Sequence, residues 1–230
     1  MLSLYFSGTG NTRHLAELLA KKLGCPAVSI EAQDAAEQIA RTDSLIFAFP
    51  IYMTNMPGIV RDYINGNAEF WKGKRVFILA ACAMVSGAAV ANAAALFRWH
   101  GAEILGGETV KMPDNIGDVR LITTLLPKRR NPKVLSRADK KISALAELIE
   151  RGAYPRHGLS AKAHPQAEKP GNPGPKIDKA KCDGCGICKK NCPSPQKCTL
   201  CYRCFNLCPQ QAITLMGDKV RLQYLYEDLG

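Results

Sequence analysis

Residues 2–23 read LSLYFSGTGNTRHLAELLAKKL, and this stretch decides how the N-terminal part of the chain folds. Apolar residues dominate from Leu2 to Phe6, a length and composition typical of a buried strand. Small residues follow, and from Thr12 to Leu23 apolar residues recur at helical spacing. The sequence therefore predicts a strand, a tight loop and a helix, which is the first unit of a parallel α/β sheet.

The same alternation of short apolar runs and amphipathic stretches continues to about residue 150. Further strands are expected at residues 27–30, 44–49, 75–81 and 103–111. Further helices are expected at residues 56–65, 88–100 and 137–151. Right-handed connections then give an α/β, doubly wound, five-stranded parallel sheet. Of the two common strand orders, Rossmann and flavodoxin-like, five strands favour the flavodoxin-like one.

The loop after the first strand, Ser7-Gly8-Thr9-Gly10-Asn11-Thr12, has the composition of a phosphate cradle. Backbone N–H groups and hydroxyls converge at such a helix start, and the helix dipole favours negative charge there. The loop has neither the lysine of a P-loop nor G-x-G-x-x-G spacing, so a mononucleotide monophosphate fits it best. An ordinary capped turn between strand and helix is the alternative.

Eight of the ten cysteines form two consecutive copies of the pattern C-x2-C-x2-C-x3-C-P. The first copy contains Cys182, Cys185, Cys188 and Cys192, and the second contains Cys198, Cys201, Cys204 and Cys208. Three thiolates at this spacing bind one 4Fe-4S cluster, and the fourth reaches the other cluster. Two crossed ligand sets are therefore predicted: Cys182, Cys185, Cys188 with Cys208, and Cys198, Cys201, Cys204 with Cys192.

Structural zinc sites also use C-x2-C pairs, and they are the alternative reading of this block. Zinc takes four ligands from two pairs, which leaves the third cysteine of each copy and the following proline unexplained. The two cysteines outside the block, Cys25 and Cys82, are expected to be small buried apolar residues.

The composition changes twice after the α/β region, and these changes set the expected domain boundaries. We expect one domain at residues 1–152, an extended linker rich in Pro and Gly at residues 153–175, and a small α+β domain with the cysteines at residues 176–230. Short strands are expected in the last domain at residues 212–215 and 220–225.

The loop Ser7–Thr12 resembles the T/S-x-T-G-N-T phosphate loop of flavodoxins, and residues 1–150 follow that family's order of elements. The resemblance implies that FMN is bound, with its ring between the loops after the third and fourth strands. The implied cofactor-binding residues are Ser7, Thr9, Gly10, Asn11, Thr12, Pro50, Tyr52, Thr54, Asn55, Ala83 and Gly87. Tyr52 is the candidate for stacking on the ring, with a core tyrosine as the alternative. Residues 113–115 and Cys82 are further candidates for flavin neighbours.

The cysteine block resembles the bacterial two-cluster ferredoxins, although only residues 193–197 separate its two copies. Together the two parts resemble the fused flavodoxin-ferredoxin proteins of anaerobic bacteria and archaea. The resemblance implies a flavo-iron-sulfur protein that passes electrons between two 4Fe-4S clusters, an FMN and an external redox partner. The alternative is a flavin-dependent reductase of a small substrate, fed by the clusters. No catalytic acid-base pair is evident, and the four histidines are scattered.

The net charge of +11 raises the question of an acidic partner or a nucleic acid. No basic stripe interleaved with aromatic residues is present, so no nucleic-acid partner is expected. Residues 128–130 and the lysines Lys176, Lys179, Lys181, Lys189 and Lys190 form either a docking face for an acidic redox protein or a merely solvated surface. The sequence shows neither a signal peptide nor an apolar run of about 20 residues, so a cytoplasmic protein without membrane contact is expected.

Overall fold

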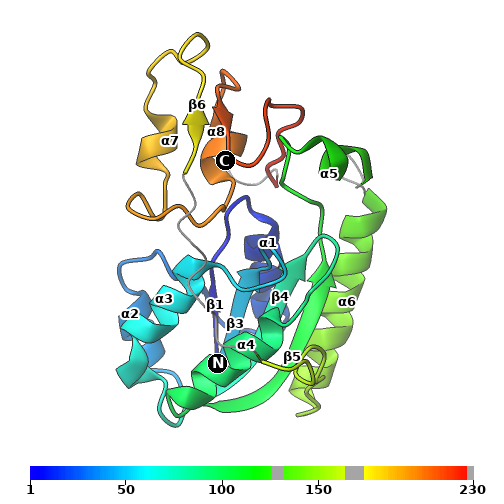
Figure 1. Cartoon of the computed structure of the whole chain (residues 1–230). Helices are drawn as coiled ribbons and strands as arrows, with labels where there is room; N and C mark the ends of the chain where they lie inside the picture. Colours follow the sequence, from blue (N-terminus) through cyan, green and yellow to red (C-terminus); the bar gives the residue numbers. More distant parts are fainter. Residues whose placement is uncertain (126–131, 164–173, 227–230) are drawn as a thin grey trace.

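The computed structural model describes residues 1–125, 132–163 and 174–226, and Figure 1 shows its arrangement. One parallel sheet has the strand order β2-β1-β3-β4-β5. Its strands are β1 (Leu2–Tyr5), β2 (Ala27–Ser29), β3 (Ser44–Pro50), β4 (Arg75–Cys82) and β5 (Glu103–Lys111). This order is the flavodoxin-like form of the doubly wound fold, and it confirms the predicted fold class.

Helices cover both faces of this sheet and bury two separate cores. They are α1 (Asn11–Lys22), α2 (Ala35–Ala40), α3 (Gly58–Gly66), α4 (Ala89–Trp99) and α6 (Pro132–Glu150), with a 3-10 turn at Ala68–Phe70. A further helix, α5 (Arg120–Leu125), lies beyond the end of the sheet (Figure 1). Alternate residues of β3 face opposite ways, so Phe47 packs with α3 and α4 while Ile46 packs with α1 and α6. Two helices, α2 and α5, were not predicted, because six residues are too few to show a helical repeat.

Residues 153–163, which were expected to begin the linker, lie along the edge strand β5. The amide of Gly107 donates to the carbonyl of Pro155 at 2.8 Å, and Tyr154 packs against the core beside α6. The buried Glu108 carboxylate binds both His157 and Lys141 at 2.8 Å. This part of the expected linker is therefore packed on the sheet, and the rest of it, residues 164–173, lies outside the described residues.

The cysteine-bearing residues 174–226 form a small α+β unit, which we call the cysteine module. It contains β6 (Lys176–Ile177) paired antiparallel with β7 (Ile213–Thr214), and the short helices α7 (Ile187–Lys190) and α8 (Arg203–Leu207). The module lies over the carboxyl ends of the sheet strands (Figure 1).

The expected strand at residues 212–215 is present as β7, but the one at 220–225 is absent. There the amides of Arg221 and Leu222 donate to the carbonyl of Gly117, at 2.9 and 3.1 Å, instead of to a strand partner. The tail is thus fastened to the α/β unit. Within the described ranges, no helix is long and apolar enough to cross a membrane.

Candidate functional site

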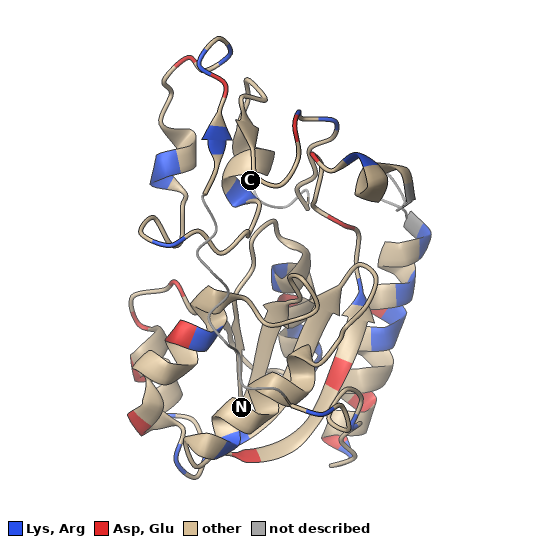
Figure 2. Ribbon diagram, in the orientation of Figure 1, with Lys and Arg blue, Asp and Glu red and all other residues tan. Residues whose placement is uncertain are grey.

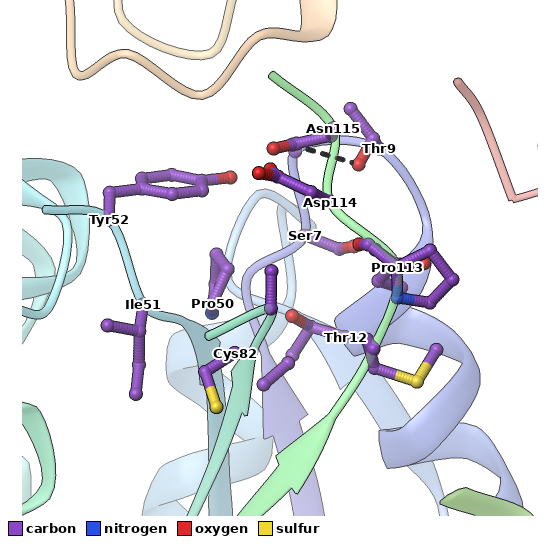
Figure 3. Close-up of a pocket in the computed structure, with 15 residues that line it drawn as sticks. Ser7, Thr9, Thr12, Pro50, Ile51, Tyr52, Cys82, Pro113, Asp114 and Asn115 are labelled. Atoms are coloured by element: carbon purple, nitrogen blue, oxygen red, sulfur yellow. Dashed lines mark hydrogen bonds between the residues drawn. The ribbon is translucent and has the colours of Figure 1, made fainter. Parts of the chain in front are cut away.

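A cavity opens at the carboxyl ends of the sheet strands, where ligands bind in open α/β folds (Figure 3). It lies at the point where the strand order reverses between β1 and β3. Loops after β1, β3, β4 and β5 line it with Ser7, Gly8, Thr9, Asn11, Thr12, Pro50, Ile51, Tyr52, Ala81, Cys82, Ala83, Met112, Pro113, Asp114 and Asn115. We call this cavity the switch-point pocket.

The phosphate-loop candidates surround one side of the switch-point pocket. The hydroxyl oxygen Oγ1 of Thr12 is buried there without any hydrogen-bond partner in the described structure. Thr12 lies in the first turn of α1, whose leading N–H groups lack intrahelical acceptors. A buried hydroxyl without a partner is rare in proteins, so it marks a place where a ligand atom is expected. The donor set fits a phosphate group.

Other side chains of this loop are already engaged, so they brace it. Asn11 donates from Nδ2 to the carbonyl of Pro113 at 2.7 Å and accepts from the hydroxyl of Tyr224 at 2.9 Å. The amide of Asn115 donates to Thr9 Oγ1 at 3.1 Å. Gly10 lies in the left-handed region with φ 96°, which lets its amide reach Ser7 Oγ at 3.1 Å.

The switch-point pocket has a volume of about 40 Å³ as the space open to the centre of a water molecule, and its total empty volume, open solvent included, is about 360 Å³. The larger figure lies in the lower range of ligand pockets. The ring of Tyr52 extends toward Asp114 and Asn115 from the opposite side of the pocket (Figure 3).

The ring-loop candidates divide into two groups. Pro50, Tyr52 and Ala83 line the pocket, whereas Thr54, Asn55 and Gly87 do not. Instead, Tyr52 and Asn55 exchange backbone hydrogen bonds of 2.9 and 3.0 Å that close a tight turn. Asn55 braces that turn by accepting from Asn92 of α4 at 2.8 Å. These residues therefore shape the loop that carries Tyr52 and do not line the pocket themselves.

Two titratable side chains, Cys82 and Asp114, also line the pocket. Cys82 is buried as expected, and burial raises the pKa of its thiol. Burial also raises the pKa of the Asp114 carboxyl, although backbone N–H groups of Ile116 and Asn115 act in the opposite direction. Both side chains lie where the sequence placed possible flavin neighbours. The described histidines are elsewhere, since none of them lines this pocket.

The cysteines of the two motifs line two further cavities, in the combinations that the spacing predicts. One cavity is lined by four cysteines that we call the outer set: Cys182, Cys185, Cys188 and Cys208. The other cavity is lined by four that we call the inner set: Cys192, Cys198, Cys201 and Cys204. Cys188 of the outer set also lines this second cavity. None of these eight cysteines forms a disulfide. Among described residues, no group of three or more His, Cys, Asp or Glu side chains is arranged to hold a metal ion, so the cluster assignment stays a prediction.

The two cysteine sets differ in exposure. Cys182 and Cys185 of the outer set are exposed, whereas Cys201 of the inner set is 8% exposed and belongs to the hydrophobic core beside α3 and α4. Burial raises the pKa of the Cys201 thiol to about 11 and that of Cys204 to about 12. Cys201 and Cys204 thus need a strong positive partner, such as a metal ion, to be present as thiolates at neutral pH.

A fully buried carboxylate, Asp118, attaches the cysteine module to the α/β unit. It accepts from the Tyr202 hydroxyl at 2.8 Å and from the amides of Leu215, Met216 and Gly217 at 2.7, 3.0 and 3.0 Å. The sequence analysis missed this residue, because it belongs to no motif and its partners lie 84 to 99 positions away.

A family model described as Flavodoxin domain matches residues 2–99, the part that carries β1 to α4. Similar solved structures include a flavodoxin from the domain Archaea, with 14% identity and TM-score 0.46 over 65% of this chain and 97% of that one. They also include two-electron reduced Megasphaera elsdenii flavodoxin, with 20% identity and TM-score 0.46 over 64% and 99%. A third is the Trp repressor binding protein from Bacillus subtilis, with 18% identity and TM-score 0.46 over 62% and 95%. Comparison with the curated proteins gives no match.

Proposed function

We propose that this chain is an electron-transfer protein that passes electrons between two 4Fe-4S clusters, an FMN and an external redox protein. One observation carries the proposal: the switch-point pocket and the inner cysteine set adjoin each other. Tyr52, which lines the pocket, donates its hydroxyl hydrogen bond to the carbonyl of Cys201 at 3.4 Å. The two sites at which cofactors are expected are therefore in direct contact.

In the flavin site, the loop amides and Thr12 Oγ1 hold the phosphate of FMN, and Tyr52 lies beside the ring. The matched flavodoxin domain model covers the phosphate loop and the loops that carry Tyr52 and Ala83. FMN accepts two electrons, whereas each 4Fe-4S cluster exchanges one, so the pair joins one-electron and two-electron chemistry. Reduced thiolate ligands suit a cytoplasmic location.

The external partner is an acidic redox protein that approaches the outer set. Residues 174–192 contain five lysines and two aspartates, a surplus of three positive charges, and all of them are exposed. Figure 2 shows lysines on β6, which precedes the first motif, and on α7, which lies within it. Opposite charge at such a surface speeds the encounter between two proteins. Residues 128–130, the other basic candidate, lie outside the described residues.

Anaerobic purification followed by analysis of iron, sulfide and flavin tests this proposal. We expect about eight irons, eight sulfides and one FMN per chain. The variant Cys185→Ser should lose about half of the iron and keep the FMN, and the control Cys25→Ser should keep both. Zinc in place of iron, or protein that takes up no FMN, would contradict the proposal.

A reductase acting on a small substrate is the second candidate, and the position of Asp114 favours it. Its half-buried carboxyl lines the switch-point pocket and has a raised pKa, which are properties of a proton donor to a bound substrate. Mixing the reduced protein with a panel of small oxidants distinguishes the candidates. Rapid oxidation by one compound, lost in Asp114→Asn, indicates the reductase.

A further inference from the structure

The cysteine module meets the phosphate loop through the side chain of Arg203, which lies between two cysteines of the second motif. Its Nε donates to the carbonyl of Gly8 at 3.2 Å, and one Nη donates to the carbonyl of Ser7 at 2.7 Å. The two Nη atoms also pair with both oxygens of Glu31, at 2.6 and 2.8 Å. The Arg203 side chain is 18% exposed and the Glu31 side chain 32%, so this forked pair is partly shielded from solvent.

The same guanidinium reaches back into the first motif. One Nη donates to the carbonyl of Asn191 at 3.3 Å, and Asn191 immediately precedes Cys192 of the inner set. Arg203 itself separates Cys201 from Cys204 by its place in the motif. One side chain thus contacts the phosphate loop and both chain segments that supply the inner cysteines.

The backbone of Gly8 is in close contact with the module. A side chain at Gly8 would collide with the carbonyl oxygen of Cys201 and the hydroxyl of Tyr52. Only glycine lets the two backbones approach this closely. In the outer set, by contrast, Cys182 and Cys185 are exposed.

The hydrogen bonds to Ser7 and Gly8 also orient the peptide groups of the phosphate loop. In a planar trans peptide, the carbonyl and the following N–H point in opposite directions. Because Arg203 binds the carbonyls of Ser7 and Gly8 from the module side, the amides of Gly8 and Thr9 are turned away from the module. These amides belong to residues that line the switch-point pocket.

We propose that Arg203 is a positioning residue that orients the phosphate loop for FMN and holds the inner set against it, so that electrons pass between outer set, inner set and flavin in that order. The inference rests on the proposed function. An external donor gives one electron to the outer cluster, which passes it to the inner cluster and then to the flavin. Two such transfers, with protons from solvent, reduce the flavin fully.

Arg203→Gln tests the positioning role, with Arg203→Lys as the conservative variant and Arg41→Gln, at the exposed arginine that follows α2, as the control. Flavin binding by the flavin-free protein is measured from the loss of FMN fluorescence, and cluster-to-flavin electron transfer is followed after a laser pulse with a photoreductant. We expect a Kd for FMN at least tenfold higher and a transfer rate at least tenfold lower in Arg203→Gln. Arg203→Lys should recover part of both, and Arg41→Gln should match the wild type.

Glu31→Gln provides a second test if Arg203→Gln does not fold. It weakens the ion pair between Arg203 and Glu31 without changing a residue of the cysteine module. It should change the Kd and the rate in the same direction by about threefold. Wild-type protein without iron or FMN would overturn the proposed function and this inference together. Wild-type protein that binds both, with unchanged Kd and rate in the Arg203 and Glu31 variants, would overturn this inference alone.

The order of the sites is tested by removing one cysteine from each set. Cys185→Ser should leave transfer from the remaining cluster to the flavin within about twofold, while Cys198→Ser should lower it at least tenfold, with FMN content equal in both. The opposite ranking would show that the outer set, and not the inner one, exchanges electrons with the flavin.

Discussion

The two cysteine motifs have identical spacing, yet the structure gives them opposite surroundings. The first is exposed from residue 181 to 186, and the second lies against the α/β unit with Tyr202 and Phe205 buried. The residues between the cysteines account for the difference: the first motif contains glycine, aspartate and lysine, and the second contains leucine, tyrosine and phenylalanine. Spacing therefore encodes the ligand pattern, and the intervening residues encode which copy docks.

Asp118→Ala should have the largest effect on the contrast between the two motifs, because it should release the second motif from the α/β unit. The substitution leaves the Tyr202 hydroxyl, the buried amide of Leu215 and the part-buried amides of Met216 and Gly217 without their acceptor, which should cost on the order of 4 kcal/mol of docking stability. Hydrogen exchange of the amides of residues 215–217 measures the loss. Asp183→Ala is the matched control in the first motif, where the carboxylate is fully exposed, and it should leave these amides protected. Equal exchange in both variants would contradict a docking role for Asp118.

Gly8→Ala should weaken the inner contact from the other side. The added Cβ has no room beside the Cys201 carbonyl, so the module must shift, at a cost of roughly 1–3 kcal/mol. We expect a lower melting temperature and faster reaction of Cys201 with a thiol reagent in the cluster-free protein. The control is Gly66→Ala at the end of α3, where a Cβ meets nothing within 4 Å. If Gly8→Ala behaved like this control, the close approach would not matter for docking.

Thr12→Val sharpens the comparison by separating flavin binding from docking. The Thr12 hydroxyl has no hydrogen-bond partner among the residues that the structure describes, so its loss should leave the stability of the flavin-free chain unchanged or slightly higher. FMN affinity should fall about tenfold, because a hydrogen bond to phosphate is lost. Calorimetric titration and thermal unfolding measure the two quantities. Thr123→Val, which removes a 2.9 Å bond to the carbonyl of Arg120, should show the reverse pattern.

Lys189→Glu combined with Lys190→Glu should produce the smallest effect, and only on the exposed motif. We expect electron exchange with an acidic ferredoxin to slow about threefold at low ionic strength and to show no difference at about 1 M salt. Stopped-flow absorbance measures the rates. The double variant Lys21→Glu and Lys22→Glu, at the distant end of α1, is the control. A slower rate in the control as well would mean that overall charge, and not this surface, guides the partner.

The sequence predicted the sheet well because each strand is a short apolar run between loop residues. It predicted only part of the lining of the switch-point pocket. Thr12 and Tyr52 line the pocket, whereas Thr54 and Asn55 belong to the turn beside it. That turn depends on Asn92, which packs from another element and has no sequence signal near it. The role of Arg203 could not be predicted either, since the residue occupies an unspecified position of the cysteine pattern and its partners lie up to 196 residues away.

The contacts of the tail with the phosphate loop bear on the order in which the molecule matures. Tyr224 binds Asn11, 213 positions earlier, and the amide of Tyr226 donates to the carbonyl of Thr9 at 2.9 Å. During synthesis the phosphate loop is made first, and it lacks these two contacts until Tyr224 and Tyr226 have left the ribosome. At roughly 5–20 residues per second, that delay is on the order of 10–40 seconds. A nascent chain therefore presents an unbraced phosphate loop, and cofactor insertion should follow completion of the cysteine module.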